Sequence, residues 1–232
     1  MKVLVAIPAL NESETIADVI LQIRKYCDYD VLVVDDGSTD ATGQHALGAG
    51  GIVLTHPFNV GVGAAMRSAF SYALRMNYDI VVQIDADGQH PPKEMQAVIE
   101  LLNSVDVGIG SRLSEKTSYK FSVPRRIAIA SLSSLLKVLT GKKIHDPTSG
   151  FRASNKNAIK VFAQYYPSEY LGDTVASILI ADRFGLNVAE TKVEMRSRQG
   201  GEPSQNLFRS CVLLARVIMV LVITKFRRLE SI

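Results

Sequence analysis

The chain has 232 residues, of which 47% are hydrophobic and 21% are charged, and its formal net charge is +3. This composition excludes a disordered chain, a collagen-like repeat and a disulfide-stapled small domain, and the length suits one domain of moderate size. The mean hydropathy of +0.13 is high, yet the longest uncharged apolar run, residues 217–223, is far shorter than the roughly 20 residues of a membrane-spanning helix. Cys27 and Cys211 are isolated, and the N-terminal stretch lacks a signal-peptide pattern, so we expect a cytoplasmic protein.

The first half of the chain alternates between apolar runs and segments of helical periodicity. Ser13 is placed to cap a first helix, in which Ile16, Val19 and Ile20 recur at helical spacing. Further helices are predicted at residues 61–76 and from Pro91 onward, with a short one after Thr39 or Asp40. The apolar runs predict buried strands at residues 2–9, 30–34, 52–55, 80–84 and 105–109. This order predicts an α/β fold with a mostly parallel sheet and helices on both faces.

The second half is less regular. Periodicity predicts helices at residues 127–139, 169–184 and 207–225, and alternation predicts a strand at 187–195. Residues 114–124, 146–152 and 196–204 read as loops, the last of them rich in glycine and arginine. We therefore expect a catalytic domain over residues 1–205 and a C-terminal apolar and basic helix over residues 206–232.

Polar clusters follow three of the predicted strands. They are Asn11-Glu12, Asp35-Asp36 and Asp85-Ala86-Asp87. Ligands of open parallel sheets bind beyond the carboxyl ends of the strands, so the three clusters predict one shared crevice.

The pair Asp85 and Asp87 is the sharpest chemical feature of the sequence. Two carboxylates flanking one small residue can hold Mg²⁺ or Mn²⁺, which prefer oxygen ligands and often bind through carboxylates together with substrate phosphates. Gln89 and His90 could add a ligand or support one. The alternative is a capped strand-to-helix turn whose acids are only solvated.

Two further motifs suit a nucleotide. A carboxylate at Asp36 can accept hydrogen bonds from a ribose or base, although Asp, Gly and Ser are also ordinary turn residues. Gly61 and Gly63 open a helix whose N-terminus favours anions, although such a helix can also start with glycines because it packs tightly. The spacing is not that of a dinucleotide fingerprint, which argues against a NAD enzyme.

Arginines are candidates for binding anions. Arg196 and Arg198 could clamp phosphate oxygens, and Arg112 and Arg152, each after a glycine-containing loop, could hold an anionic acceptor. The alternative for all four is a place on the solvated surface.

Six motifs occur in order along the chain: Pro8-Ala9-Leu10-Asn11-Glu12, residues 35–40 (DDGSTD), residues 59–65 (NVGVGAA), residues 85–90 (DADGQH), Gly110-Ser111-Arg112 and residues 148–152 (TSGFR). Together they closely resemble glycosyltransferase family 2, specifically its dolichyl-phosphate mannosyltransferase-like branch, over residues 1 to about 205. The resemblance implies a GT-A fold, inverting transfer from a nucleotide-diphosphate sugar, and a divalent metal.

The resemblance also implies residue roles. It implies that Pro8, Asn11, Glu12 and Asp36 contact the nucleoside and that Asp85 lies near the ribose or sugar. It implies that Asp87 and Gln89 bind the metal, together with Asp85. It implies that Arg112, Ser149 and Arg152 bind the acceptor phosphate and that the segment 196–204 closes over the diphosphate. Relatives often carry an acid near the helix around Glu169; here Glu169 and Asp173 are both available, and we expect Asp173 to be the base if one is needed.

The expected function is transfer of a sugar to a polyprenyl phosphate at the cytoplasmic face of the membrane. The alternatives are transfer to a sugar hydroxyl of a cell-envelope glycan or glycolipid, a nucleotidyltransferase, and a non-catalytic module that binds nucleotide sugars. Members of this branch often carry C-terminal transmembrane helices, whereas we expect none in this sequence.

The C-terminal part bears on the partners. Residues 196–228 hold seven basic side chains and one acid, a local charge of +6. The helix at 207–225 could lie on an anionic leaflet, dock on a small membrane protein or a second copy of the chain, or pack on the catalytic domain. No nucleic-acid partner is expected.

Overall fold

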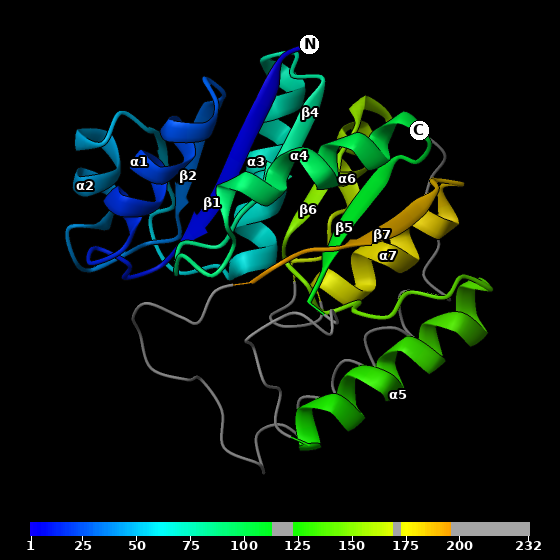
Figure 1. Cartoon of the computed structure of the whole chain (residues 1–232). Helices are drawn as coiled ribbons and strands as arrows, with labels where there is room; N and C mark the ends of the chain where they lie inside the picture. The colour runs from blue at the N-terminus through cyan, green and yellow to red at the C-terminus, as the bar shows by residue number, and fades with distance from the viewer. Residues whose placement is uncertain (113–122, 169–172, 196–232) are drawn as a thin grey trace.

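The computed structural model describes residues 1–112, 123–168 and 173–195, with only the backbone of 123–125 (Figure 1). Its centre is a seven-stranded sheet in the order β3-β2-β1-β4-β6-β5-β7. All neighbouring strands run parallel except β6, which is antiparallel to both β4 and β5. The predicted α/β class with a mostly parallel sheet is therefore confirmed.

The strands of the sheet are β1 (Val3–Ala9), β2 (Asp30–Asp35), β3 (Ile52–Thr55), β4 (Ile80–Gln83), β5 (Val107–Ser111), β6 (Arg152–Ser154) and β7 (Val188–Lys192). The helices are α1 (Ile16–Tyr26), α2 (Thr42–Gly48), α3 (Val62–Arg75), α4 (Met95–Glu100), α5 (Val123–Thr140), α6 (Lys156–Tyr165) and α7 (Asp173–Arg183). Short 3₁₀ turns at Pro92–Glu94 and Leu101–Asn103 flank α4.

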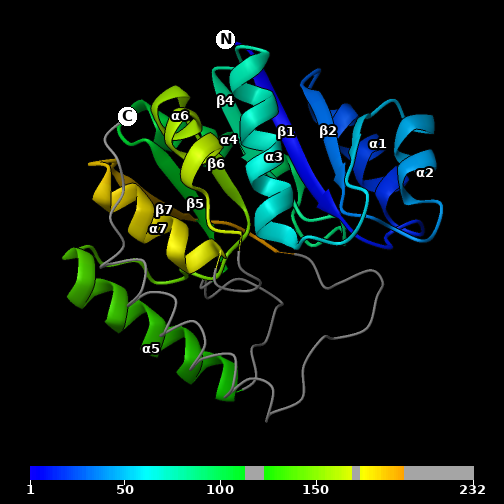
Figure 2. The same cartoon turned by 180° about the vertical axis from the view of Figure 1, so that it is seen from behind.

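Each face of the sheet carries its own hydrophobic core. Side chains alternate along β1, so Leu4 and Ala6 join the core under α3, α6 and α7, whereas Val5 and Ile7 join the core under α1 and α4. Helices cover both faces (Figures 1 and 2). A strand buried on both faces needs apolar residues at every position, which is why its sequence is a continuous apolar run.

Several local boundaries differ from the predictions: β5 covers Val107–Ser111 and not 105–109, and α5 begins at Val123, inside the predicted loop at 114–124. The first helix begins at Ile16 and not at Ser13, because the Glu12 carbonyl accepts the N–H groups of Thr15 and Ile16 in a preceding turn. The Ser13 N–H itself donates to the Asp40 carboxylate, at 3.2 Å. The helix predicted from Pro91 is divided into a 3₁₀ turn, α4 and a second 3₁₀ turn.

Two elements were absent from the sequence-based prediction. The strand β6 has only three residues, too few to show alternation, and it continues directly from the predicted loop at 146–152. Helix α6 follows it, capped by Asn155, whose side chain accepts the N–H groups of Asn157 and Ala158. The antiparallel β6 enters the sheet between β4 and β5, which brings the residues before it beside the end of β4.

Several predictions concern residues outside the described ranges. The helix at 207–225, the second domain at 206–232, and the segment with Arg196 and Arg198 belong to this group, as does Glu169. Within residues 1–112, 123–168 and 173–195, no helix has the length and apolar character needed to span a membrane.

Candidate active site

The carboxyl ends of β1, β2 and β4 lie side by side at one edge of the sheet, because these strands are neighbours and parallel. Hydrogen bonds join the loops that follow β1 and β2: the Asn11 N–H donates to Ser38 Oγ at 2.9 Å, and the Thr39 N–H donates to Asn11 Oδ1 at 2.8 Å. Pro8 lies on β1, and the Glu12 carboxylate accepts from the Thr15 hydroxyl at 3.1 Å. The structure thus confirms that the predicted polar clusters share one edge.

Asp36 anchors the segment that leads into α3. Its buried carboxylate accepts three hydrogen bonds, from His56 Nδ1 at 2.7 Å, from the Val60 N–H at 3.0 Å and from the Gly61 N–H at 2.7 Å. His56 Nε2 in turn lies 2.9 Å from Ser68 Oγ on α3. The Gly61 N–H therefore faces Asp36, and both predicted nucleotide contacts, Asp36 and Gly61, have a structural task as well.

Gly63 shows why this helix starts with glycines. A Cβ placed there would lie 2.1 Å from the Pro167 carbonyl oxygen and 3.0 Å from Asp173 Cβ. At this glycine the close neighbour is the chain itself, as the tight-packing alternative expects. The first turn of α3 is thereby held against the start of α7.

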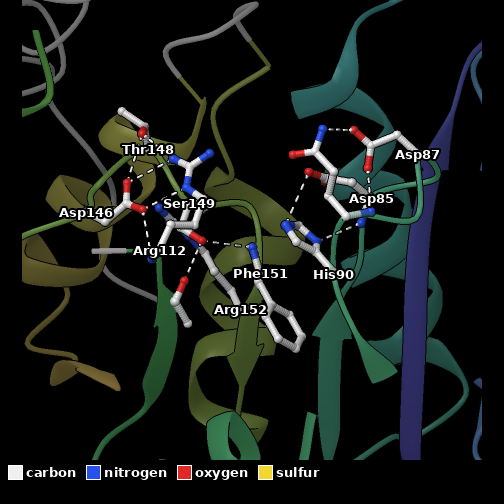
Figure 3. Close-up of polar contacts among 11 residues, drawn as sticks. Asp85, Asp87, His90, Arg112, Asp146, Thr148, Ser149, Phe151 and Arg152 are labelled. Carbon is white, nitrogen blue, oxygen red and sulfur yellow. Dashed lines mark hydrogen bonds and ion pairs between the residues drawn. The ribbon is translucent and has the colours of Figure 1, made fainter. Parts of the chain in front are cut away.

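The acidic cluster after β4 is built around Asp87 and His90. Asp87 accepts from the Gln89 N–H at 3.0 Å and from Gln89 Nε2 at 2.8 Å (Figure 3). The Asp85 N–H donates to His90 Nδ1 at 3.0 Å, so His90 carries its proton on Nε2, which lies 3.5 Å from the Asp85 carboxylate. His90 therefore supports Asp85, whose side chain is 42% exposed at the sheet edge.

These oxygen atoms fit a hard divalent cation. Asp85 and Asp87 supply carboxylates, and Gln89 adds an amide oxygen next to Asp87. Among the described residues, no three His, Cys, Asp or Glu side chains form a closed metal cluster. Such an incomplete set is typical of Mg²⁺ and Mn²⁺ sites that take further ligands from substrate phosphates and water.

The opposite side of the site is held by an ion pair. Arg112, at the end of β5, binds the Asp146 carboxylate through Nε at 2.8 Å and through Nη2 at 2.9 Å, and the same Nη2 lies 2.6 Å from Thr148 Oγ1 (Figure 3). Burial raises the pKa of the Asp146 carboxyl, but the hydrogen bonds and charge of Arg112 outweigh burial and hold that pKa below its usual range. The guanidinium is thereby fixed in direction.

Ser149 and Arg152 form the inner wall of the same loop. The Ser149 hydroxyl donates to the Gly110 carbonyl at 2.6 Å. The buried Arg152 donates to the carbonyls of Ser149 and Pro147, each at 2.8 Å, and to Ser177 Oγ on α7 at 2.7 Å. Both residues, expected to touch an acceptor phosphate, hold the loop shape in this structure.

The two halves of the site meet at Gly150 and Phe151. The Phe151 ring stacks on the His90 ring with centroids 5.0 Å apart, and a Cβ on Gly150 would lie 3.0 Å from Asp85 Oδ1. The acidic cluster and the loop of residues 146–151, which binds Arg112, are therefore direct neighbours and lie side by side in Figure 3.

Asp173 lies at the start of α7, where the charges of both Arg152 and Asp85 act on it. It is 3% exposed, and burial raises the pKa of its carboxyl to about 6 although the positive charge of Arg152 acts in the opposite direction. The Asp85 charge also raises this pKa. A carboxylate with such a pKa can accept a proton near neutral pH, which suits a general base.

Sequence reasoning missed two residues of this site. Asp146 is fully buried and orients Arg112, and its only signal was a polar run directly before the 148–152 motif. His56 gave no signal, because it acts on Asp36, which is far away in the sequence.

The chain matches the model of the family described as glycosyl transferase family 2 over residues 4–162. It is 33% identical, over 171 residues, to the polyprenol monophosphomannose synthase of Mycolicibacterium smegmatis, covering 68% of this chain and 63% of that protein. It is 29% identical to the undecaprenyl-phosphate mannosyltransferase of Micrococcus luteus, covering 87% of this chain and 86% of that one. An uncharacterized protein of Methanocaldococcus jannaschii is 31% identical over 196 residues, which cover 83% of this chain and 81% of that protein.

The fold also has relatives among solved structures. Glucosyl-3-phosphoglycerate synthase from Mycobacterium tuberculosis, crystallised with Mn²⁺, uridine diphosphate and phosphoglyceric acid, superposes with a TM-score of 0.73 at 23% identity, covering 99% of this chain and 80% of that one. At this identity the likeness concerns the fold. The chain belongs to glycosyl transferase family 2, in the branch of the polyprenyl-phosphate sugar transferases.

Proposed function

We propose that this protein transfers a sugar, with inversion, from a nucleotide-diphosphate sugar to a polyprenyl phosphate at the cytoplasmic face of the membrane. The observation that carries the proposal is the contact between the acidic cluster and the loop of residues 146–151 through His90 and Phe151. A donor held at the first and an anionic acceptor held at the second would have their reacting atoms side by side. The names of the relatives support the acceptor class.

On the donor side, Asp87, Gln89 and Asp85 are the residues that would hold Mg²⁺ or Mn²⁺. When bound, the cation supplies positive charge that neutralises the departing nucleoside diphosphate. The end of β1 with Pro8, the loop with Asn11 and Glu12, and the segment that Asp36 anchors to α3 line the edge where the nucleoside would lie. We still predict that Arg196 and Arg198 bind the diphosphate of the donor.

On the acceptor side, Arg112 offers a positive charge whose direction Asp146 and Thr148 fix. A phosphate monoester is already anionic at neutral pH, so it needs orientation more than it needs a base. Arg152 and Ser149 support this task by shaping the loop that carries Thr148.

A sugar hydroxyl as acceptor is the second candidate, and the burial of Asp173 favours it. A hydroxyl must lose its proton as it attacks, and a carboxyl whose pKa is about 6 is suited to take it. With this acceptor, activity should rise with pH around 6, and D173N should lose it. With a phosphate acceptor, D173N should keep most activity.

Helix α5 supports a location at the membrane. Its buried side holds Ile129, Leu132 and Leu136, whereas Ile127 and Val138 are 62% and 81% exposed. Arg126 and Lys137 are exposed next to them, and the helix contains no acidic residue. Figures 1 and 2 place α5 at the end of the sheet where the parallel strands finish. We therefore expect this face of α5 to contact an anionic leaflet. Residues 206–232 are the second segment that we expect to contact the membrane surface, a small membrane protein or a second copy of the chain.

The deciding experiment uses the purified chain with GDP-mannose, UDP-glucose, UDP-N-acetylglucosamine and a dTDP-sugar, each with Mg²⁺ or Mn²⁺ and polyprenyl phosphate. Release of nucleoside diphosphate together with a lipid-linked sugar is expected for one donor. Transfer that requires a glycan hydroxyl would overturn the lipid-phosphate acceptor. Binding without turnover on either acceptor class would overturn the transferase proposal.

Asp87→Ala tests the metal site. Removing this carboxylate should lower metal-dependent turnover by about 100-fold, the upper end of what loss of metal-site support costs. Asp28→Ala is the matched control, since Asp28 is exposed in the turn before β2 and should leave turnover unchanged. Full activity of the Asp87 variant in the presence of Mg²⁺ would contradict the assignment.

A further inference from the structure

A partly buried carboxylate on β7 binds the residue directly before Asp146. This carboxylate belongs to Glu190, in the middle of the strand. The His145 N–H donates to Glu190 Oε2 at 2.6 Å, and His145 Nδ1 lies 2.7 Å from Glu190 Oε1. An ionised carboxylate only accepts hydrogen bonds, so Nδ1 carries the hydrogen in this pair. Both oxygens of Glu190 therefore bind His145.

The strand that carries Glu190 is paired with the strand that leads to Arg112. Strand β7 runs parallel to β5, with Glu190 beside Ile109. Further along the pair, the Val193 N–H donates at 3.1 Å to the carbonyl of Ser111, the residue directly before Arg112. These backbone hydrogen bonds fix Glu190 relative to the backbone of Arg112.

The residue that follows His145 fixes the guanidinium of Arg112. The Asp146 carboxylate accepts from Arg112 Nε at 2.8 Å and from Arg112 Nη2 at 2.9 Å. It also accepts from the Arg112 backbone N–H at 3.2 Å. Because Glu190 lies on the strand paired with β5, its contact with His145 joins the two sides of this ion pair a second time, through the backbone.

A second acid anchors the same segment at another point. Asp182 on α7 lies 3.2 Å from the ammonium of Lys142, which is four residues before Asp146. Its side chain is 22% exposed, close to the 15% of Glu190. The two acids therefore hold the segment after α5 from similar depths, but only Glu190 binds the residue next to Asp146.

We propose that Glu190 is a positioning residue, which orients Arg112 for the acceptor phosphate by holding His145, and with it Asp146, beside β5. This inference rests on the proposed function, because it assigns Glu190 to the acceptor side of the transfer site. A guanidinium with a fixed direction binds a phosphate with a smaller loss of side-chain freedom than one that must first be ordered. Glutamate is otherwise disfavoured in strands, and this task explains its presence on β7.

The kinetic test compares Glu190→Met with Asp182→Ala in transfer to polyprenyl phosphate from the donor that supports it. Methionine has about the length of glutamate but cannot hold the His145 N–H, so the KM for polyprenyl phosphate should rise about 10-fold. The kcat and the KM for the donor should not change, because the phosphate contact is weakened equally before and during the reaction. Asp182→Ala should lower the melting temperature and leave all three constants unchanged. A purely structural role predicts unchanged constants in both variants, and this result would overturn the proposal.

The conservative variant Glu190→Gln shows whether the hydrogen bonds are the cause. Its amide oxygen can accept the His145 N–H, and its amide nitrogen can donate to Nδ1. Glu190→Gln should therefore keep the KM for polyprenyl phosphate near the wild-type value. A KM as high as that of Glu190→Met would contradict the proposal.

NMR follows Arg112 without any need for turnover. The Arg112 Nε–H signal, assigned by its loss in Arg112→Lys, should exchange slowly with water in the wild type because Nε donates to Asp146. Exchange should be about 10-fold faster in Glu190→Met and unchanged in Glu190→Gln and Asp182→Ala. Equal exchange in Glu190→Met and the wild type overturns the proposal even if the wild-type chain transfers no sugar to polyprenyl phosphate. Wild-type inactivity on that acceptor would count against the proposed function alone.

Discussion

At the scale of single residues, Asp173 combines a proposed place at the transfer site with a cost to stability. Burial raises its pKa from the ordinary value of 3.8 to about 6, so the folded chain holds the proton more tightly than the unfolded chain does. Between these two pH values the folded state binds more protons, and stability therefore falls as pH rises from about 4 to about 6. A buried ionised carboxylate beside Asp85 is the physical reason.

Asp173→Asn should remove this loss of stability. The variant should be more stable than the wild type at pH 8, by on the order of 3 kcal/mol for a shift of this size, and the two should converge near pH 4, where Asp173 is protonated. Urea unfolding at pH 4, 6 and 8 measures the difference. A stability difference that is equal at all three pH values would show that Asp173 does not titrate in this range.

At the scale of elements, the first turn of α3 organises the site. Asp36 binds the N–H groups of Val60 and Gly61 just before the helix, and Gly63 lets the helix approach the Pro167 carbonyl. The helix therefore links the proposed donor side, through Asp36, to the start of α7, through Gly63. This role explains why small residues occupy its N-terminus.

Gly63→Ala should disrupt that contact. The added methyl would lie 2.1 Å from the Pro167 oxygen, so backbone must move, and we expect a loss of about 1–3 kcal/mol in the free energy of unfolding. Gly48→Ala on α2 is the matched control, because a Cβ there meets nothing within 4 Å. The control should gain up to about 1 kcal/mol from helix propensity. Equal stability of the two variants in chemical unfolding would refute the close approach.

At the scale of the whole molecule, the candidate active site and helix α5 lie at the same end of the sheet. The strand ends with Asp85 and Arg112 lie at this end, and α5 leads into the loop with Asp146. A lipid phosphate presented by a bilayer at α5 would therefore meet the acceptor side first.

Charge reversal on α5 tests this orientation. Arg126→Glu with Lys137→Glu should weaken flotation with vesicles that contain anionic lipid by about 30-fold or more at low salt, at roughly 1 kcal/mol per basic residue. Lys25→Glu with Lys160→Glu makes the same charge change on exposed positions of α1 and α6 and should have little effect. If the two double variants float alike, α5 is not the membrane-facing helix.

Much of the architecture was predictable because its signals are local. The continuous apolar runs of β1, β2 and β4 and the acids that follow them indicated a parallel sheet with a polar edge, and the motifs indicated the family. The three residues of β6 are too few to show a period, so neither this strand nor its antiparallel direction could be predicted.

The sequence by itself determined the fold class, the family and the identity of the acidic cluster, since each depends on patterns within a few residues. Only the tertiary structure decided what those side chains touch. It directed the Asp36 carboxylate to the segment before α3, paired Arg112 with the buried Asp146, and turned Arg152 inward to Ser177. These contacts join residues that are distant along the chain, and burial, which sets the pKa of Asp173, exists only when the layers have packed.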